Sequence, residues 1–210
     1  MGRVLIACEF SGAVRRAFAA RGHDAWSCDL LPAEDRSNKH LIGDVRQFLG
    51  DGWDLLIVCH PPCTRLCKSG LRWLHTPPKG KTLDEMWAEL DEAAALFSAC
   101  WNAPVERIAV ENPIMHRHAK ARIVNFRDPA QTIQPWQFGH GETKATCLWL
   151  KRLPDLLPTK IVTGREQRVF RMPARKDRWK ERSRTYPGIA DAMAEQWGGL
   201  LEFDFMEAAQ

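Results

Sequence analysis

The sequence predicts an α/β protein in which a mostly parallel sheet is covered by helices on both faces. Short apolar runs alternate with amphipathic stretches along the first two-thirds of the chain. The run Leu55–Cys59 is strongly apolar and is bounded by Asp54 and a Pro-Pro pair, as expected for a buried strand. Residues 83–100 show helical periodicity instead. Strands that alternate with helices in this way indicate a mostly parallel sheet.

The elements can be assigned in chain order. Val4–Cys8 is expected to form the first strand, and residues 13–21 a helix that ends at Gly22, a residue suited to the left-handed conformation after a helix. The helix over residues 83–100 gathers apolar side chains on one face, namely Leu83, Met86, Trp87, Leu90, Ala94 and Phe97. The other expected elements are strands at 24–28, 55–59, 107–110 and 146–150, a short run at 40–42, and a helix from Tyr186 through Trp197 that Gly198 and Gly199 stop.

The length of 210 residues fits one domain with a small appendage. We predict an α/β domain over residues 1–150, a short basic segment over 151–185, and a C-terminal helix within 186–210 that returns to the domain. No stretch approaches the roughly 18 apolar residues of a membrane helix, and the first apolar run lacks the features of a signal peptide. We therefore expect a cytoplasmic protein with no membrane partner, whose seven cysteines are thiols.

The positive charge is concentrated in one part of the chain. The formal net charge is only +4, which does not by itself indicate a nucleic-acid partner. The segment from Lys151 to Arg184 is strongly basic, however, and one local basic face is what phosphate binding requires. We predict that it binds DNA, with a solvated loop as the alternative. Its cations are Arg165, Arg168, Arg171, Arg175, Lys176, Arg178, Lys180, Arg182 and Arg184.

Chemically useful side chains follow the ends of the predicted strands. In parallel sheets, ligands bind beyond the carboxyl ends of the strands. Five loops are therefore expected to open on one edge of the sheet. They carry Glu9-Phe10-Ser11-Gly12, Asp29, Gly43-Asp44, His60-Pro61-Pro62-Cys63 and Glu111-Asn112-Pro113.

Cys63 and Glu111 form the candidate catalytic pair. A thiolate that adds to C6 of cytosine places electron density on C5, which can then take a methyl group from a sulfonium donor. Two prolines stiffen the backbone before Cys63, and the helical turn expected after it would favour a negative sulfur. A carboxyl group beside the ring can protonate N3, particularly if burial raises its pKa, and Glu111 is placed to do so. Taken singly, Cys63 could instead be a buried structural cysteine and Glu111 the start of a turn.

The order of these motifs resembles that of the DNA cytosine-5 methyltransferases, especially the short phage-type members, over residues 4–150 and again over 186–197. The resemblance implies a Rossmann-like S-adenosyl-L-methionine (SAM) domain in a bacterial or phage-infected cell. It implies a catalytic group of Cys63, Glu111, Asn112 and Lys144. It implies that SAM, or a modified SAM, is bound by Glu9, Phe10, Ser11, Gly12, Asp29, Leu30, Asp44, Val45 and Pro61. Tyr186-Pro187-Gly188-Ile189 corresponds to the motif that returns the last helix to the SAM pocket.

The chain also departs from the family pattern. Val14 stands where many relatives have a second glycine. Lys144 and Thr146 occupy the place of the arginines that usually contact the base edge. Only about 35 residues are available where typical members carry a target-recognition domain of about 100, so this chain alone is not expected to read a long site. A homodimer could supply the missing contacts.

The segment that follows the nucleophile mixes basic and aromatic residues. A base in duplex DNA must leave the stack to reach Cys63, and we hypothesise that the loop 67–73 closes over it. Lys68 and Arg72 would then meet phosphates, while Trp73 would stack on the substrate or pack in the core. The expected substrate-binding residues are Pro62, Thr64, Lys68, Ser69, Arg72, Trp73 and Thr146.

Two other clusters receive simpler interpretations. Cys59, Cys63 and Cys67 are spaced by four, but the intervening prolines break the helix that a metal site would need, so we expect no metal. The stretch 134–140 resembles a signature of the short phage-type proteins, and the residues alone give no physical account of it.

Two other functions remain open on the sequence alone. The same chemistry could act on a free pyrimidine nucleotide or on RNA, as the short recognition segment suggests. The chain could also be a catalytically silent module that binds SAM or nucleic acid.

Overall fold

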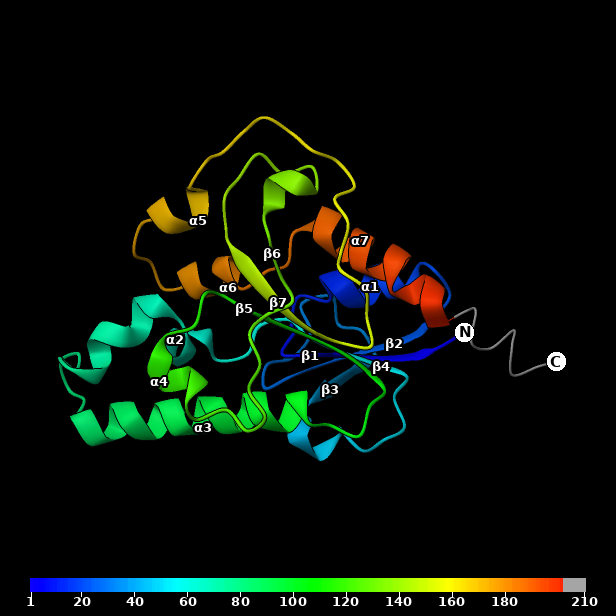
Figure 1. Cartoon of the computed structure of the whole chain (residues 1–210). Helices are drawn as coiled ribbons and strands as arrows, with labels where there is room; N and C mark the ends of the chain where they lie inside the picture. The colour runs from blue at the N-terminus through cyan, green and yellow to red at the C-terminus, as the bar shows by residue number, and fades with distance from the viewer. Residues whose placement is uncertain (202–210) are drawn as a thin grey trace.

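The computed structural model describes residues 1–201 and centres on a seven-stranded sheet of order β3-β2-β1-β4-β5-β7-β6 (Figure 1). The strands from β1 to β5 pair in parallel, whereas β7 runs antiparallel to both of its neighbours. The order 3-2-1-4-5 is that of a doubly wound sheet, in which the direction of winding reverses between β1 and β4. The strands are β1 Arg3–Ala7, β2 Asp24–Asp29, β3 His40–Ile42, β4 Leu55–Val58, β5 Arg107–Asn112, β6 Gln131–Ile133 and β7 Thr146–Lys151.

Helices cover both faces of this sheet, as the apolar runs predict. On one face α1 (Ala13–Ala19) packs against α7 (Pro187–Gln196), and on the other lies the long α3 (Leu83–Trp101) (Figure 1). A reciprocal capping box between Thr82 and Glu85 begins α3. The shorter helical segments are η1 Val45–Gln47, α2 Cys63–Leu66, η2 Lys68–Leu74, α4 Arg117–Lys120, η3 Pro135–Gln137, α5 Arg168–Arg171 and α6 Arg178–Arg182.

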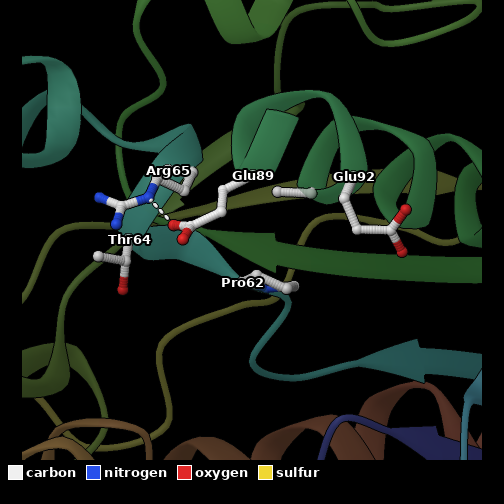
Figure 2. Close-up of a pocket in the computed structure, with 6 residues that line it drawn as sticks. Pro62, Thr64, Arg65, Glu89 and Glu92 are labelled. Atoms are coloured by element: carbon white, nitrogen blue, oxygen red, sulfur yellow. Dashed lines mark hydrogen bonds and ion pairs between the residues drawn. The ribbon is translucent and has the colours of Figure 1, made fainter. Parts of the chain in front are cut away.

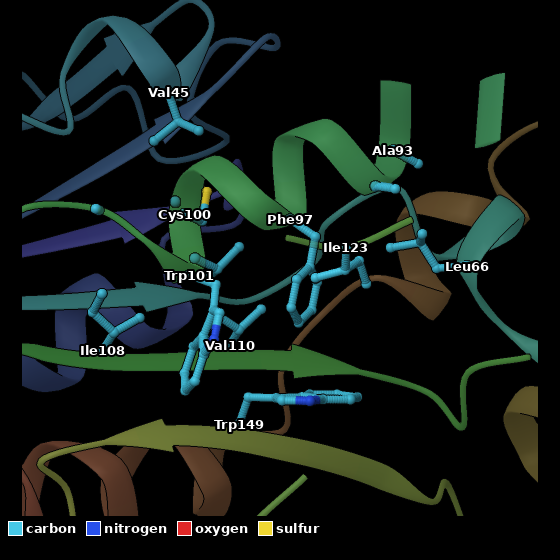
Figure 3. Close-up of a cluster of buried hydrophobic side chains, with 14 of the residues drawn as sticks. Val45, Leu66, Ala93, Phe97, Cys100, Trp101, Ile108, Val110, Ile123 and Trp149 are labelled. Carbon is cyan, nitrogen blue, oxygen red and sulfur yellow. The ribbon is translucent and has the colours of Figure 1, made fainter. Parts of the chain in front are cut away.

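The central strands divide their side chains between two cores. Leu56 and Val58 of β4 join the cluster beneath α3, whereas Leu55 and Ile57 join the cluster beneath α1 and α7. Successive residues of a strand point to opposite faces, so a continuous apolar run places apolar side chains on both. Figure 3 shows Phe97 of α3 above Trp149 of β7, with ring centroids 5.3 Å apart. The predicted α/β fold with a mostly parallel sheet is therefore confirmed.

Differences from the predicted elements lie at their ends. The strand expected to stop at Val110 continues to Asn112, so Glu111 belongs to β5 itself. Gly22 has the expected positive φ of 83°. The expectation that Gly198 and Gly199 stop the last helix was wrong, because the chain turns at Trp197 and is helical again from residue 198. A Cβ at position 198 would lie 2.7 Å from His23 Nε2, so this glycine permits a close approach instead.

None of the helices within residues 1–201 is long and apolar enough to cross a membrane. The last nine residues of the predicted C-terminal segment, 202–210, lie outside the described residues.

Candidate active site

The loop that carries Cys63 leaves β4 and is held against the loop that leaves β5. Cys63 begins α2, and the backbone N–H of Lys68 donates to the carbonyl of Ile114 at 2.9 Å. The backbone N–H of His116 donates in turn to the carbonyl of Leu66 at 3.1 Å. Gly70 permits a close approach within the Cys63 segment itself, since a Cβ there would lie 1.8 Å from the carbonyl oxygen of Thr64. The two loops therefore form one unit at the carboxyl edge of the sheet.

Glu111 lies next to a histidine that the sequence analysis did not include in the site. The Glu111 side chain is buried near the end of β5, and its Oε2 lies 3.3 Å from His60 Nδ1. The other ring nitrogen of His60 lies 3.2 Å from Thr185 Oγ1. His60 thus connects the carboxylate on β5 with the segment that precedes α7.

Cys63, Glu111 and Lys144 lie close enough for their charges to interact. The charges of Glu111, Lys144 and Arg182 all act on the pKa of the Cys63 thiol, and Lys144 also acts on Glu111. Lys144 Nζ donates to the carbonyl oxygen of Arg182 at 3.1 Å, which ties Lys144 to α6. The structure therefore brings together three of the four residues expected to be catalytic, and it adds Arg182 from the basic segment.

The expectation that Cys63 is shifted toward thiolate was wrong for the protein without substrate. Burial, together with the nearby Cys67 and Glu111, raises the pKa of the Cys63 thiol to about 11. Lys144 and Arg182 lower it but do not compensate. One turn of helix gives too little dipole to offset the loss of hydration. Cys63 is therefore a protonated thiol at neutral pH.

This assignment predicts how Cys63 reacts with iodoacetamide. The thiolate is the reactive form, so the alkylation rate of Cys63 should rise about tenfold per pH unit and level off only near pH 11. Mass spectrometry of the Cys63 peptide measures this rate, and acid quenching stops the reaction at each time point. A plateau at or below pH 9 would show that the thiol is not held protonated.

The pKa of Glu111 is not raised, although burial alone would raise it. Burial raises the pKa of this carboxyl, but the positive charge of Lys144 and the contact with His60 outweigh burial, so that the pKa is lowered overall. Glu111 is therefore ionised at neutral pH. The free protein holds a thiol beside a carboxylate, with the one mobile proton on sulfur.

Asn112 is the fourth residue expected to be catalytic. It directly follows Glu111 in the sequence, and its side chain is fully buried. Its Nδ2 donates to the carbonyl oxygen of Pro113 at 2.7 Å. Its Oδ1 has no hydrogen-bond partner within residues 1–201. A buried acceptor left unpaired carries a free-energy cost of about 1–3 kcal/mol, so this oxygen is available for an incoming donor group.

The loop after β1 is organised largely by its own side chains. Glu9 is completely buried, and its carboxylate accepts from the backbone N–H groups of Val14 at 2.8 Å and Arg15 at 3.2 Å. Ser11 Oγ donates to the same carboxylate at 3.4 Å. Gly12 has a φ of 66°, a backbone conformation that is unfavourable for residues other than glycine. Glu9 and Ser11 therefore hold the N-terminus of α1, and their side chains are occupied by this contact.

Phe10 is buried, whereas Asp29 is partly exposed at the edge of the sheet. The Phe10 ring is covered by Trp179 of α6, with ring centroids 5.9 Å apart. Asp29 ends β2, is partly buried, and has a pKa raised by that burial. Its Oδ1 accepts from the backbone of Leu31, and the adjacent Leu30 is 75% exposed. An exposed apolar side chain beside a carboxylate suits a ribose with an attached base.

A pocket of about 320 Å³ lies between the Cys63 loop and α3 (Figure 2). Within it Arg65 Nε donates to Glu89 Oε2 at 2.6 Å, and at the other end Glu92 accepts from Arg46 at 2.7 Å. Arg46 also binds Asp44 and lowers the pKa of that carboxyl. The lining residues are Pro62, Thr64, Arg65, Glu89, Glu92 and Ala93. Of the other expected donor residues, the side chains of Val45 and Pro61 are buried.

The residues expected to bind substrate fall into two groups. Thr64, Lys68, Ser69 and Arg72 are exposed on the turn after Cys63. The Arg72 guanidinium lies 4.0 Å above the Trp73 ring, and Trp73 packs against the core beneath α3. Thr146 is buried and its hydroxyl donates to the carbonyl of Lys144 at 3.2 Å, so it supports Lys144.

The stretch 134–140 has a structural role that the sequence did not reveal. The backbone N–H of Gly188, at the start of α7, donates to His140 Nε2 at 3.1 Å. A Cβ on Gly188 would lie 2.0 Å from the carbonyl oxygen of Phe138, so only glycine permits this approach. Tyr186 OH donates to Glu142 at 2.7 Å. The stretch therefore positions the start of α7 and, with it, the segment that contains Thr185.

No family model matches the sequence, and no curated protein matches it. Among solved structures, the chain is similar to a protein described as a DNA modification methyltransferase encoded within a prophage of E. coli, with 16% identity and a TM-score of 0.45. The similarity covers 76% of this chain and 51% of that protein, so the chain spans about half of its length.

Proposed function

We propose that this protein is a SAM-dependent methyltransferase that modifies C5 of cytosine in DNA through a covalent bond between Cys63 and C6. The observation that carries the proposal is the grouping of Cys63, Glu111 and Lys144 at the carboxyl edge of β4 and β5. A nucleophile, an acid–base group and a cation are the side chains that addition to a pyrimidine ring requires.

The residues around the edge of the sheet fit a sulfonium nucleoside. Asp29 ends β2 with a carboxylate oxygen suited to ribose hydroxyls, and Leu30 is exposed beside it. The pocket between Pro62 and α3 offers the apolar surfaces of Pro62 and Ala93 to a flat base. When bound, SAM supplies an electrophilic methyl group.

The first catalytic step moves a proton within the site. Cys63 gives its thiol proton to the Glu111 carboxylate, which leaves a thiolate and a neutral carboxyl. Sγ then bonds to C6, the electrons of the C5=C6 bond move to C5, and Glu111 delivers its proton to N3. Lys144 and Arg182 favour the thiolate, since their charges lower the Cys63 pKa. Once C5 has taken the methyl group that bound SAM would supply, the C5 proton leaves to water and the C5=C6 bond re-forms as the S–C6 bond breaks. The N3 proton then returns through Glu111 to Sγ, which restores the thiol and the carboxylate.

The basic segment supports DNA as the substrate. Arg182 and Thr185 reach the site through the contacts with Lys144 and His60, and the other cations of the segment lie on the same connection between β7 and α7. Phosphate contacts by such residues hold a nucleic acid in register over the pocket. The segment is short, and this favours the second candidate, the same chemistry on a free pyrimidine nucleotide.

Mass spectrometry tests the proposal. Nucleosides from the DNA, the RNA and the soluble nucleotide pool of cells that express the protein should be compared with those from cells that express an inactive variant. We expect a C5-substituted deoxycytidine in DNA, and its mass identifies the transferred group. The same product only in free nucleotides would favour the second candidate, and no modified pyrimidine in any pool would contradict the proposal.

A further inference from the structure

The basic segment exposes a phenylalanine that no core packing explains. Phe170 is 76% exposed in the short helix α5, whereas the neighbouring Val169 and Met172 are buried and anchor the helix. A single exposed apolar residue is ordinary on a protein surface, so exposure alone assigns no role to Phe170. Its surroundings provide the further evidence.

A short chain of contacts connects Phe170 to the active site. The carbonyl oxygen of Val169 accepts a hydrogen bond from Arg182 Nη1 at 3.3 Å. The charge of the same Arg182 acts on the Cys63 thiol. One arginine therefore spans from the backbone of α5 to the surroundings of the nucleophile, and Figure 1 shows α5 and α6 on the same side of the molecule as α2. Phe170 directly follows Val169 in α5.

The residues beside Phe170 carry positive charge that is not used within the protein. Arg171 is exposed and forms no ion pair with any residue in the range 1–201, and the same holds for Lys176. By contrast, Arg168 is paired with Glu142, and Arg175 with Glu181. An exposed aromatic ring next to an unpaired cation is an arrangement with which proteins bind single-stranded nucleic acids, because the ring stacks on a base while the cation meets a phosphate.

We propose that Phe170 stacks on an unpaired base next to the target cytosine, so that the preferred substrate is single-stranded DNA. This rests on the function proposed above and specifies its substrate. Bases inside a duplex are covered by their neighbours and offer no face to Phe170, whereas every unpaired base does. A chain with a short recognition segment needs no machinery to open a duplex if its substrate is already open.

Binding measurements with the full chain test this inference. The probes are a fluorescently labelled single-stranded oligonucleotide with one central cytosine and the blunt duplex of the same sequence. Fluorescence anisotropy in a salt series gives the affinity and its salt slope. Phe170→Ala should weaken binding of the single strand about tenfold and leave the salt slope unchanged, because no phosphate contact is lost. Phe170→Trp should keep the affinity of the original protein.

Two matched variants serve as controls. Arg171→Ala should reduce the magnitude of the salt slope for the single strand by about 0.7, the value for one phosphate contact. Leu157→Ala removes a side chain that is 65% exposed and lies beside Gln196 at the far end of α7, so it should leave the affinity unchanged. Thermal melts monitored by circular dichroism check that each variant is folded.

The outcomes separate this inference from the proposed function. Affinity of Phe170→Ala within twofold of the original, or an equal loss on the blunt duplex, would overturn the stacking role. Methyl transfer to DNA together with unchanged binding by Phe170→Ala would overturn only this inference. A tenfold loss of single-strand binding without methyl transfer by the original protein would retain Phe170 as a stacking residue and contradict the enzymatic proposal.

Discussion

Replacement of Cys63 by serine should lower the rate of methyl transfer by at least about 10³-fold, while the fold and the binding of DNA are retained. Serine has nearly the same shape as cysteine, so the buried turn at the start of α2 should accept it. Its hydroxyl is far less acidic than a thiol, and burial already raises the pKa of the thiol to about 11. The hydroxyl therefore cannot supply a useful nucleophile at this position.

A DNA oligonucleotide that contains 5-fluorocytosine provides the direct measurement. Fluorine cannot leave C5 as a proton does, so the bond between sulfur and C6 should persist and appear as a shifted band on a denaturing gel. Cys63→Ser should lose this band. Cys67→Ser is the matched control, since Cys67 is a buried cysteine four residues away whose Sγ contacts Ser69 Oγ at 3.0 Å. An adduct that survives in Cys63→Ser would exclude Cys63 as the nucleophile.

Replacement of Glu111 by glutamine should lower kcat by about 10²- to 10⁴-fold, the usual contribution of a positioned acid or base. The amide keeps the size of the side chain and can still face His60, but it cannot accept the Cys63 proton and pass it to N3. The dissociation constants for SAM and for DNA should change little, because the loss concerns proton transfer. Single-turnover kinetics with labelled methyl donor measure the effect on the chemical step.

Glu106→Gln is the control for this substitution. Glu106 lies just before β5, is exposed, and pairs with Arg152, so loss of its charge should leave kcat unchanged. A kcat for Glu111→Gln within threefold of the original protein would show that another group carries the proton. His60 would then be the first candidate, because its Nδ1 lies 3.3 Å from the Glu111 carboxylate.

The sheet could be predicted because its signals are local. The run Leu55–Cys59 places apolar side chains on both faces, as a buried strand does. The alternation of strands with helices indicates that the strands are parallel, so the loops at their carboxyl ends are expected at one edge of the sheet. The position of Glu111 beside the Cys63 loop depends on β4 and β5 being neighbours, which the doubly wound order provides. The ends of elements were less certain, because the close approach of Gly198 to His23 involves residues far apart in sequence.

The protonation of Cys63 and the residues that the C-terminal segment brings to the site could not be predicted in the same way. The pKa of Cys63 depends on the balance between burial and the cations Lys144 and Arg182, and that balance requires coordinates. Arg182 and Thr185 belong to a segment without regular periodicity, so no pattern indicated that they reach β4 and β5. His60 did carry a signal, since it stands directly before the two prolines at a strand end, but the sequence assigned it no role.

The contacts of residues 179–185 connect the loop after β1 with the carboxylate on β5. Trp179 covers the Phe10 ring, and Arg184 binds Glu34, whose backbone N–H donates to the carbonyl of Phe10. The same stretch holds His60 through Thr185. A ligand that reaches the Phe10 ring would have to displace Trp179, and displacement of this stretch would remove the Thr185 contact of His60, the residue beside the carboxylate on β5. Under the function proposed above, exchange of the donor would therefore be coupled to the surroundings of Glu111 through one segment of the chain.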